Sequence, residues 1–229
     1  MPAIVARMRK TAPAVATAGQ DLRNARKAFT RAHICAAARQ LFVENGYAAT
    51  TMEQIGKSAG APRSTLYTHF SDKEQILDSI ADDYIIKLVA ILACVPSPRP
   101  TRAEIRDWIG NLAGFISEDR MPTILFNGIG VGLDMPRAVR RIGENVMEVL
   151  ASRLPAFAIA MTEGPAQPAY RAYAQAAVRE LSLCCQTYAI LGDEALGGPY
   201  LDVAADIFHH FALEFAGRTE LAEIASPRR

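Results

Sequence analysis

The chain has 229 residues, half of them hydrophobic and only 7% aromatic, with a formal net charge of +1. It is long enough to bury a substantial core, and no stretch shows the alternation of β-branched residues typical of strands, so we expect an all-α fold. The charge is uneven, because residues 1–80 carry 11 basic and 6 acidic groups whereas residues 81–229 carry 14 and 18. A basic front suggests that this end meets a polyanion, with chance clustering as the alternative.

The four cysteines, at positions 35, 94, 184 and 185, match neither a disulfide framework nor the paired spacing of a zinc site. Such usage is typical of a reducing compartment. Nowhere is there an apolar run of signal-peptide or membrane-span length. We therefore expect a soluble, cytoplasmic protein with no membrane segment, metal site or cofactor.

The first elements in chain order are an arm and two helices. Residues 1–25 lack sustained periodicity and predict a flexible basic arm. Between about 27 and 45, apolar residues recur on one helical face until Gly46 ends the helix. A second, short helix follows Thr51, whose hydroxyl forms a capping box with Gln54, and it ends near Gly60.

A third helix is expected over residues 61–70, with Pro62 tolerated in its first turn. Leu66 and Phe70 are four residues apart and should face inward together. The residues left outward are Arg63, Ser64, Tyr67, Thr68 and His69. A further capping box, Ser71 with Glu74, predicts the start of a longer helix that runs toward Cys94.

Prolines and glycines divide the rear of the chain. We expect helices there near residues 101–117, 121–133, 136–160, 169–191 and 199–217. The predicted organisation is an arm over 1–25, a three-helix domain over 26–75 and a second helical domain over 76–229.

Two short helices joined at Gly60, with a helix on either side, have the layout of a helix-turn-helix DNA reader. Over residues 28–80 the chain resembles the N-terminal domain of the tetracycline-repressor (TetR) family. The positions that carry the resemblance include Ile34, Ala37, Ala38, Leu41, Phe42, Gly46, Tyr47, Thr50, Thr51, Ile55, Ala59, Gly60, the run from Thr65 to Phe70, Lys73 and Glu74.

The resemblance implies roles for several side chains. Thr51 would meet a phosphate, and Arg63, Ser64 and Thr65 would lie at bases or the adjoining backbone, with Thr68 on the same surface. Tyr67, His69 and Lys73 are similar to residues that grip phosphates in the family, and their chemistry suits phosphate oxygens. The alternative for Tyr67 and His69 is packing against the next helix. Pro62, Gly56 and Ser64 depart from the family pattern.

The resemblance also implies a homodimer on palindromic DNA and a small-molecule effector. The last two helices carry apolar stripes suited either to a twofold interface or to the monomer's own core. One stripe comprises Ala174, Ala177, Val178, Leu181, Cys184, Cys185, Tyr188 and Leu191, and the other Ala204, Ile207, Phe208, Phe211 and Phe215. A pocket for a hydrophobic effector would be lined by Trp108, Phe115, Phe126, Asn127, Met147 and Phe157, with core packing as the alternative for each.

The leading interpretation is thus a ligand-responsive DNA-binding regulator, usually a repressor in the resembling family. One alternative keeps the DNA reader and makes Cys184 and Cys185 a redox or metal trigger, with His209 and His210 nearby. Buried structural cysteines are the simpler interpretation. An all-helical enzyme is a third, less favoured hypothesis because no catalytic constellation is present in the sequence.

Overall fold

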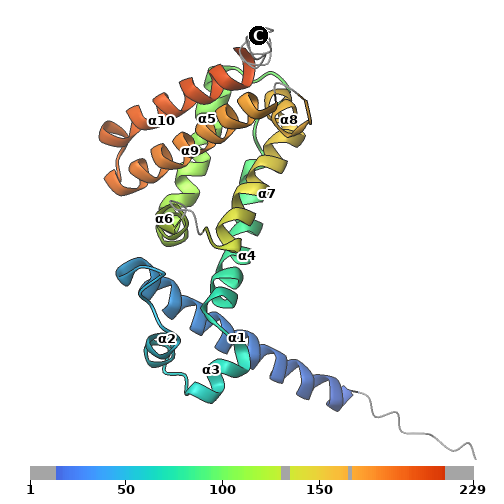
Figure 1. The fold of residues 1–229 in the computed structure, drawn as a ribbon, viewed down its shortest axis with the longest axis vertical. Coiled ribbons are helices and arrows are strands. Elements are labelled where there is room, and N and C mark those ends of the chain that lie inside the picture. Colours follow the sequence, from blue (N-terminus) through green and yellow to red (C-terminus); the bar gives the residue numbers. More distant parts are fainter. Residues whose placement is uncertain (1–13, 130–134, 165–166, 215–229) are drawn as a thin grey trace, which may run out of the picture.

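The computed structural model describes residues 14–129, 135–164 and 167–214, and over these ranges the chain is helical and contains no β-strand (Figure 1). The predicted all-α class is therefore confirmed. The α-helices are α1 (Ala14–Asn45), α2 (Met52–Ser58), α3 (Arg63–His69), α4 (Lys73–Leu92), α5 (Arg102–Glu118), α6 (Arg120–Ile129), α7 (Arg137–Arg153), α8 (Pro155–Met161), α9 (Gln167–Leu191) and α10 (Glu194–His209), followed by a π-helical turn at His210–Glu214.

The front domain packs α1, α2, α3 and the first half of α4 around one core. Its centre is fully buried and comprises Ile34, Phe42, Ile55, Leu66, Phe70, Ile76 and Leu77. Gly46 and Gly60 follow α1 and α2 with φ of +83° and +58°, a backbone conformation that favours glycine at a helix end. The predicted limits of the first two helices at these glycines are confirmed.

Caps fix where the short helices begin. The Thr51 and Gln54 side chains form the predicted capping box at the start of α2. At α4 the predicted cap is wrong by one residue. Asp72, not Ser71, is the N-cap, and its carboxylate accepts a hydrogen bond of 2.8 Å from the Gln75 amide. This backbone hydrogen bond, followed by one from the Ser71 hydroxyl, holds the pKa of the Asp72 carboxyl below its ordinary value.

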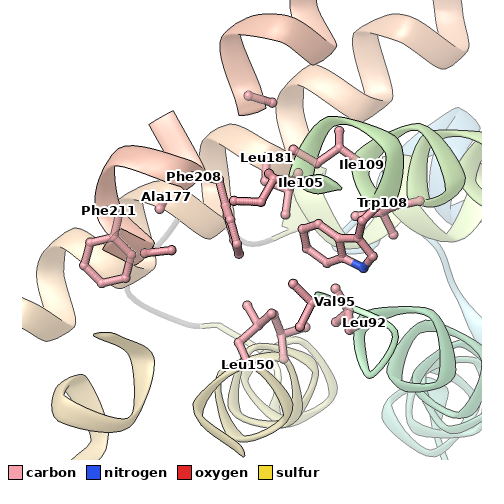
Figure 2. Close-up of a cluster of buried hydrophobic side chains, with 14 of the residues drawn as sticks. Leu92, Val95, Ile105, Trp108, Ile109, Leu150, Ala177, Leu181, Phe208 and Phe211 are labelled. Carbon is pink, nitrogen blue, oxygen red and sulfur yellow. The ribbon is translucent and has the colours of Figure 1, made fainter. Parts of the chain in front are cut away.

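The rear domain packs α5, α7, α8, α9 and α10 around a second core that also takes the end of α4. Aromatic rings meet at its centre, where Trp108 lies 5.2 Å from Phe208 between ring centroids, and Phe157 lies 4.9 Å from Phe211. Figure 2 shows Trp108 and Phe208 together above Leu150 and Val95. The Trp108 indole N–H donates to the Ile91 carbonyl at 3.2 Å, so its polar group is satisfied inside the core.

Helix α4 belongs to both cores. Ile76, Leu77 and Ile80 pack in the front domain, whereas Leu88 and Leu92 pack in the rear domain. Ion pairs join α7 to the front half of α4, with Arg137 at 2.9 Å from Asp78 and Arg141 at 2.6 Å from Asp82. The two domains are therefore connected through the continuous helix α4, through α7, and through α6, whose Leu125 and Phe126 pack in the front core.

Two predicted boundaries in the front and middle of the chain are wrong. The arm expected over residues 1–25 is helical from Ala14 onward, and residues 1–13 lie outside the described ranges. The single helix expected over 136–160 is two helices, α7 and α8. Leu154 adopts an extended conformation before Pro155, as residues before proline do, and Pro155 then occupies the first position of α8.

The last helix also differs from the prediction, because α10 begins at Glu194 rather than at 199 and passes through the segment expected to be a break. Asp193 caps it. A Cβ at Gly197 would lie 2.7 Å from Tyr188 Cδ2, so this glycine permits close packing of α10 on α9 rather than ending a helix.

None of the helices in the described ranges is long and apolar enough to cross a membrane.

Candidate nucleic-acid interface and ligand cavity

Helix α3 has one buried side and one polar side. Leu66 and Phe70 are each 1% exposed, as the sequence predicts. Arg63, Ser64, Tyr67 and Thr68 are exposed, and Thr65 and His69 are half-buried. The outward surface therefore offers guanidinium, hydroxyl and phenol groups on a helix short and narrow enough for a DNA major groove.

Helix α1 fixes the C-terminal end of α3. The Arg31 guanidinium lies 4.1 Å from the centre of the Phe70 ring, and it donates a hydrogen bond of 3.0 Å to the His69 carbonyl. A cation over an aromatic face is attracted by the ring's quadrupole. One arginine thus connects the long first helix to the end of α3, which restrains the direction of the polar side.

Helix α2 approaches α3 closely at Gly56. A Cβ at this position would lie 3.2 Å from the Ala61 carbonyl oxygen and 3.3 Å from Leu66 Cδ2. Glycine at this position therefore accommodates the tight packing of the Leu66 side chain. Gly56, which the sequence analysis singled out, thus has a packing role.

The side chains predicted to contact DNA phosphates differ in their exposure and in their hydrogen bonds within the protein. The exposed Thr51 hydroxyl caps α2 and hydrogen-bonds Gln54 at 3.0 Å. Tyr67 is 45% exposed, with the Arg63 guanidinium 5.5 Å from its ring centre. His69 is half-buried, and its Nδ1 atom is buried without a hydrogen-bond partner in the protein. Of the predicted phosphate-gripping pair, Tyr67 is the more accessible.

Lys73 has a role that the sequence did not predict. Its ammonium donates to the carbonyls of Tyr47, Ala48 and Thr50 at 2.8, 2.9 and 3.1 Å, and it lies 4.6 Å from the Tyr47 ring centre. An ammonium has three protons, so these carbonyls match its full donor capacity. Lys73 holds the turn between α1 and α2 in place.

A cavity of about 820 Å³ lies between α4, α5, α6, α7 and α9. Three of the predicted pocket residues line it, namely Phe126, Asn127 and Met147. The prediction is wrong for Trp108 and Phe157, which pack in the aromatic centre of the rear core. It is also wrong for Phe115, which stacks on Tyr84 and borders a smaller cavity of about 200 Å³ beside α1.

Polar groups are more numerous in the large cavity than the sequence predicts. Tyr84 and Thr123 share a hydrogen bond of 3.0 Å, and burial raises the pKa of the Tyr84 phenol. Asn127 donates to Ser182 and to Gln186, each at 3.1 Å. The lining also includes Arg140, Arg171, Arg179 and Glu144.

The predicted stripes on the last two helices face mainly inward. Ala174, Ala177, Leu181, Ala204 and Phe208 are all buried in the monomer. Phe215 lies outside the described residues. A different set of large apolar side chains is exposed on α9 and α10, comprising Tyr173, Leu183, Ile190, Leu191, Leu196, Tyr200, Val203 and Ile207. Of the predicted stripes, only Leu191 and Ile207 belong to this exposed set.

Cys184 and Cys185 are buried free thiols on α9. Burial raises the pKa of both, that of Cys185 to about 12, so at neutral pH both remain protonated. Within the described part of the chain, no three His, Cys, Asp or Glu side chains gather as a metal site would require. These environments are those of structural cysteines rather than reactive ones.

Comparison with known proteins agrees with this geometry. Residues 34–80 match the family model described as bacterial regulatory proteins, tetR family. Over 51 residues the chain is 43% identical to the HTH-type transcriptional regulator UidR of Escherichia coli K12 and 39% identical to the HTH-type transcriptional regulator AcrR of Shigella flexneri. These matches cover 22% of this chain and about a quarter of each relative, 26% and 24% respectively.

The fold likeness extends further than the sequence likeness. The crystal structure of a tetR family transcription regulator from Shewanella sp. PV-4 superposes with a TM-score of 0.59 at 15% identity, covering 79% of this chain and 96% of that one. The predicted architecture, a helix-turn-helix front and a helical rear, is therefore confirmed as a fold.

The contacts of Lys73 generate a prediction that separates positioning from phosphate binding. Lys73→Met should lower the free energy of unfolding in urea by about 1 to 3 kcal/mol, because three carbonyls lose a charged donor. The slope of log affinity for DNA against log salt should stay unchanged. Lys87→Met, at an exposed lysine of α4, is the matched control and should change stability by no more than about 0.5 kcal/mol. A slope reduced by about one, with stability unchanged, would instead make Lys73 a phosphate ligand.

Proposed function

The chain belongs, through its front domain, to the tetR family of bacterial regulatory proteins, and from this premise we propose that it is a ligand-responsive transcriptional repressor. It binds operator DNA as a twofold dimer, and a small molecule in the rear cavity releases it. The observation that carries the proposal is the two-sided helix α3, with Leu66 and Phe70 buried and Arg63, Ser64, Tyr67 and Thr68 exposed.

The DNA contacts follow from the exposure and chemistry of each side chain. Arg63 is the residue for direct base recognition, since a guanidinium pairs bidentately with guanine. Ser64, Thr65 and Thr68 offer hydroxyls beside it, although the Thr68 hydroxyl already donates to the Ser64 carbonyl at 2.8 Å. These four residues form the base-facing surface.

Phosphate contacts come from the edges of that surface. Tyr67 presents its phenol from α3, and Thr51 presents its hydroxyl at the start of α2, where capping and phosphate binding are compatible. His69 contributes only its exposed edge, since its Nδ1 is buried. Lys73 acts through the turn that it holds and is a positioning residue.

Dimerisation uses the exposed apolar face of α9 and α10. Leu183, Ile190, Leu196, Tyr200 and Val203 are between 44% and 60% exposed in the monomer. These helices pack side by side in the rear domain (Figure 1). Two such pairs can form a four-helix interface in which the same surface of each copy meets the other. The twofold axis would then present two α3 helices to successive major grooves.

Ligand binding is coupled to DNA binding through α4. Tyr84, Leu88 and Leu92 of α4 line the cavity, whereas Ile76 and Leu77 of the same helix anchor the front domain. A ligand that favours one orientation of α4 therefore favours one placement of α3, and it shifts the population by its difference in affinity for the two states.

A redox or metal trigger at Cys184 and Cys185 has less support. Both thiols are buried and have raised pKa values, which disfavour the thiolate that oxidants and soft metals require. The buried pair contributes packing to α9.

A gel shift with the DNA upstream of the protein's own gene tests the DNA contacts. Tyr67→Phe should weaken binding to every sequence by a similar factor, because only a phosphate contact is lost. Arg63→Gln should lose about 1 to 3 kcal/mol on the preferred site and relax the preference for one base pair. Arg99→Gln, at an exposed arginine between α4 and α5, is the matched charge control and should bind normally. Normal affinity and preference in both α3 variants would refute the proposed contacts.

Sedimentation equilibrium tests the dimer surface. Ile190→Asp and Val203→Asp should each convert the dimer to a monomer, because a carboxylate buried in an apolar interface lacks a partner. Both variants should also lose most of their operator affinity. Ile86→Asp replaces a 70% exposed isoleucine of α4, away from this face, and should remain dimeric. A dimer that survives both α9 and α10 substitutions would place the interface elsewhere.

A further inference from the structure

The buried and the exposed side chains that line the large cavity differ in polarity. The buried lining side chains are apolar and include Leu92, Leu112, Ile116, Phe126 and Met147. The exposed lining side chains include three arginines, at positions 140, 171 and 179. The exposed lining also includes the apolar side chains Met135, Met161 and Leu183, so the cavity has an apolar interior and a mixed opening with a net positive charge.

The three arginines come from two walls of the cavity. Arg140 lies on α7, and Arg171 and Arg179 lie two helical turns apart on α9. Because two walls supply exposed guanidinium groups to the lining of one cavity, an anionic group bound there has cationic partners on both walls. This arrangement suits a carboxylate, which guanidinium groups bind with paired N–H donors.

These guanidinium groups have no carboxylate partner among the described residues. On α7 the neighbouring Arg137 and Arg141 are paired with Asp78 and Asp82 of α4, whereas Arg140 forms no ion pair within the described chain. The same is true of Arg171 and Arg179 within those ranges. Of the three arginines near the start of α7, two therefore connect helices and one, Arg140, remains available to a ligand.

The lining contains one acidic side chain, whose negative charge offsets part of the positive charge of the arginines. Glu144 also lines the cavity, on α7. With three arginines and one glutamate, the lining carries an excess of two positive charges. A cationic ligand would be repelled by this excess, and a neutral one would leave it uncompensated.

We propose that the cavity binds an amphipathic carboxylate, with its apolar chain against the side chains of α4, α5 and α6 and its carboxylate between Arg140 of α7 and Arg179 of α9. The inference rests on the proposed function, since it specifies the chemical class of the effector at the same cavity. The volume of about 820 Å³ lies within the range of ligand pockets, roughly 300 to 1,000 Å³.

Isothermal titration of the full chain with three probes of equal chain length tests the proposal. The probes are decanoate, decan-1-ol and decyltrimethylammonium, each below its aggregation concentration. Decanoate should bind about tenfold more tightly than either of the others, as expected for charge-assisted hydrogen bonds. A preference for the alcohol or the cation, or no binding of decanoate, would overturn the proposal.

Substitution of two lining arginines tests where the carboxylate of the ligand binds. Arg140→Gln combined with Arg179→Gln should remove the preference for decanoate and leave the affinity for decan-1-ol within about twofold of the original protein. Circular dichroism of the variant should match that of the original, because both arginines are exposed. The control pairs Arg99→Gln with Arg153→Gln and removes the same charge at exposed positions outside the lining. Equal decanoate affinity in the two double variants would overturn the assignment.

A gel shift separates failure of this inference from failure of the proposed function. If decan-1-ol releases the protein from DNA and decanoate does not, the proposed regulatory function holds, and the proposal that the effector is a carboxylate is wrong. If decanoate binds and this binding depends on the arginines, but the protein binds no DNA sequence specifically with or without decanoate, the cavity assignment holds and the proposed regulatory function is wrong.

Discussion

The burial of Leu66 and Phe70 is the constraint on which the rest of the structure depends. Leu66 lies in a helix of seven residues and Phe70 follows directly after its last residue, and both side chains are almost completely removed from solvent. With these two positions fixed, the rotation of α3 about its axis is fixed as well, and Tyr67 and Thr68 between them face outward. Arg31 from α1, the close approach at Gly56 and the Lys73 ammonium at the α1–α2 turn hold the surrounding frame. The polar surface of α3 is thus a consequence of packing.

The same constraint explains the coupling role that the proposed function assigns to α4. The helix carries Ile76 and Leu77 into the core beneath α3, and it carries Leu88 and Leu92 into the rear domain beside the cavity. The ion pairs from Arg137 and Arg141 tie α7 to the front half of α4, so two of the cavity's walls are attached to the DNA-binding domain. Under the proposed function, a ligand bridging α7 and α9 would act on these walls, and the apolar packing of α3 would transmit the change without a contact between ligand and DNA.

The front domain was predictable from sequence because its signals are local. Gly46, Gly60 and the Thr51–Gln54 capping box act within a few residues, and Leu66 and Phe70 are one turn apart. The rear domain depends on tertiary contacts that periodicity does not encode. Pro155 starts a helix where continuity was expected, and Gly197 serves close packing against Tyr188 rather than a break. Trp108 and Phe157 suit a pocket as well as a core by composition, and only their packing on Phe208 decides between the two. Likewise, the apolar stripes of α9 and α10 did not reveal which side faces the monomer's own core.

Footprinting of the bound operator tests the central claim most directly, namely that the outward side of α3 lies in the major groove and that a twofold dimer presents two such helices. Dimethyl sulfate should show guanine N7 protected in two successive major grooves on one face of the duplex, with centres about 10 base pairs apart. Protection confined to a single groove, or to the minor groove alone, would contradict the account.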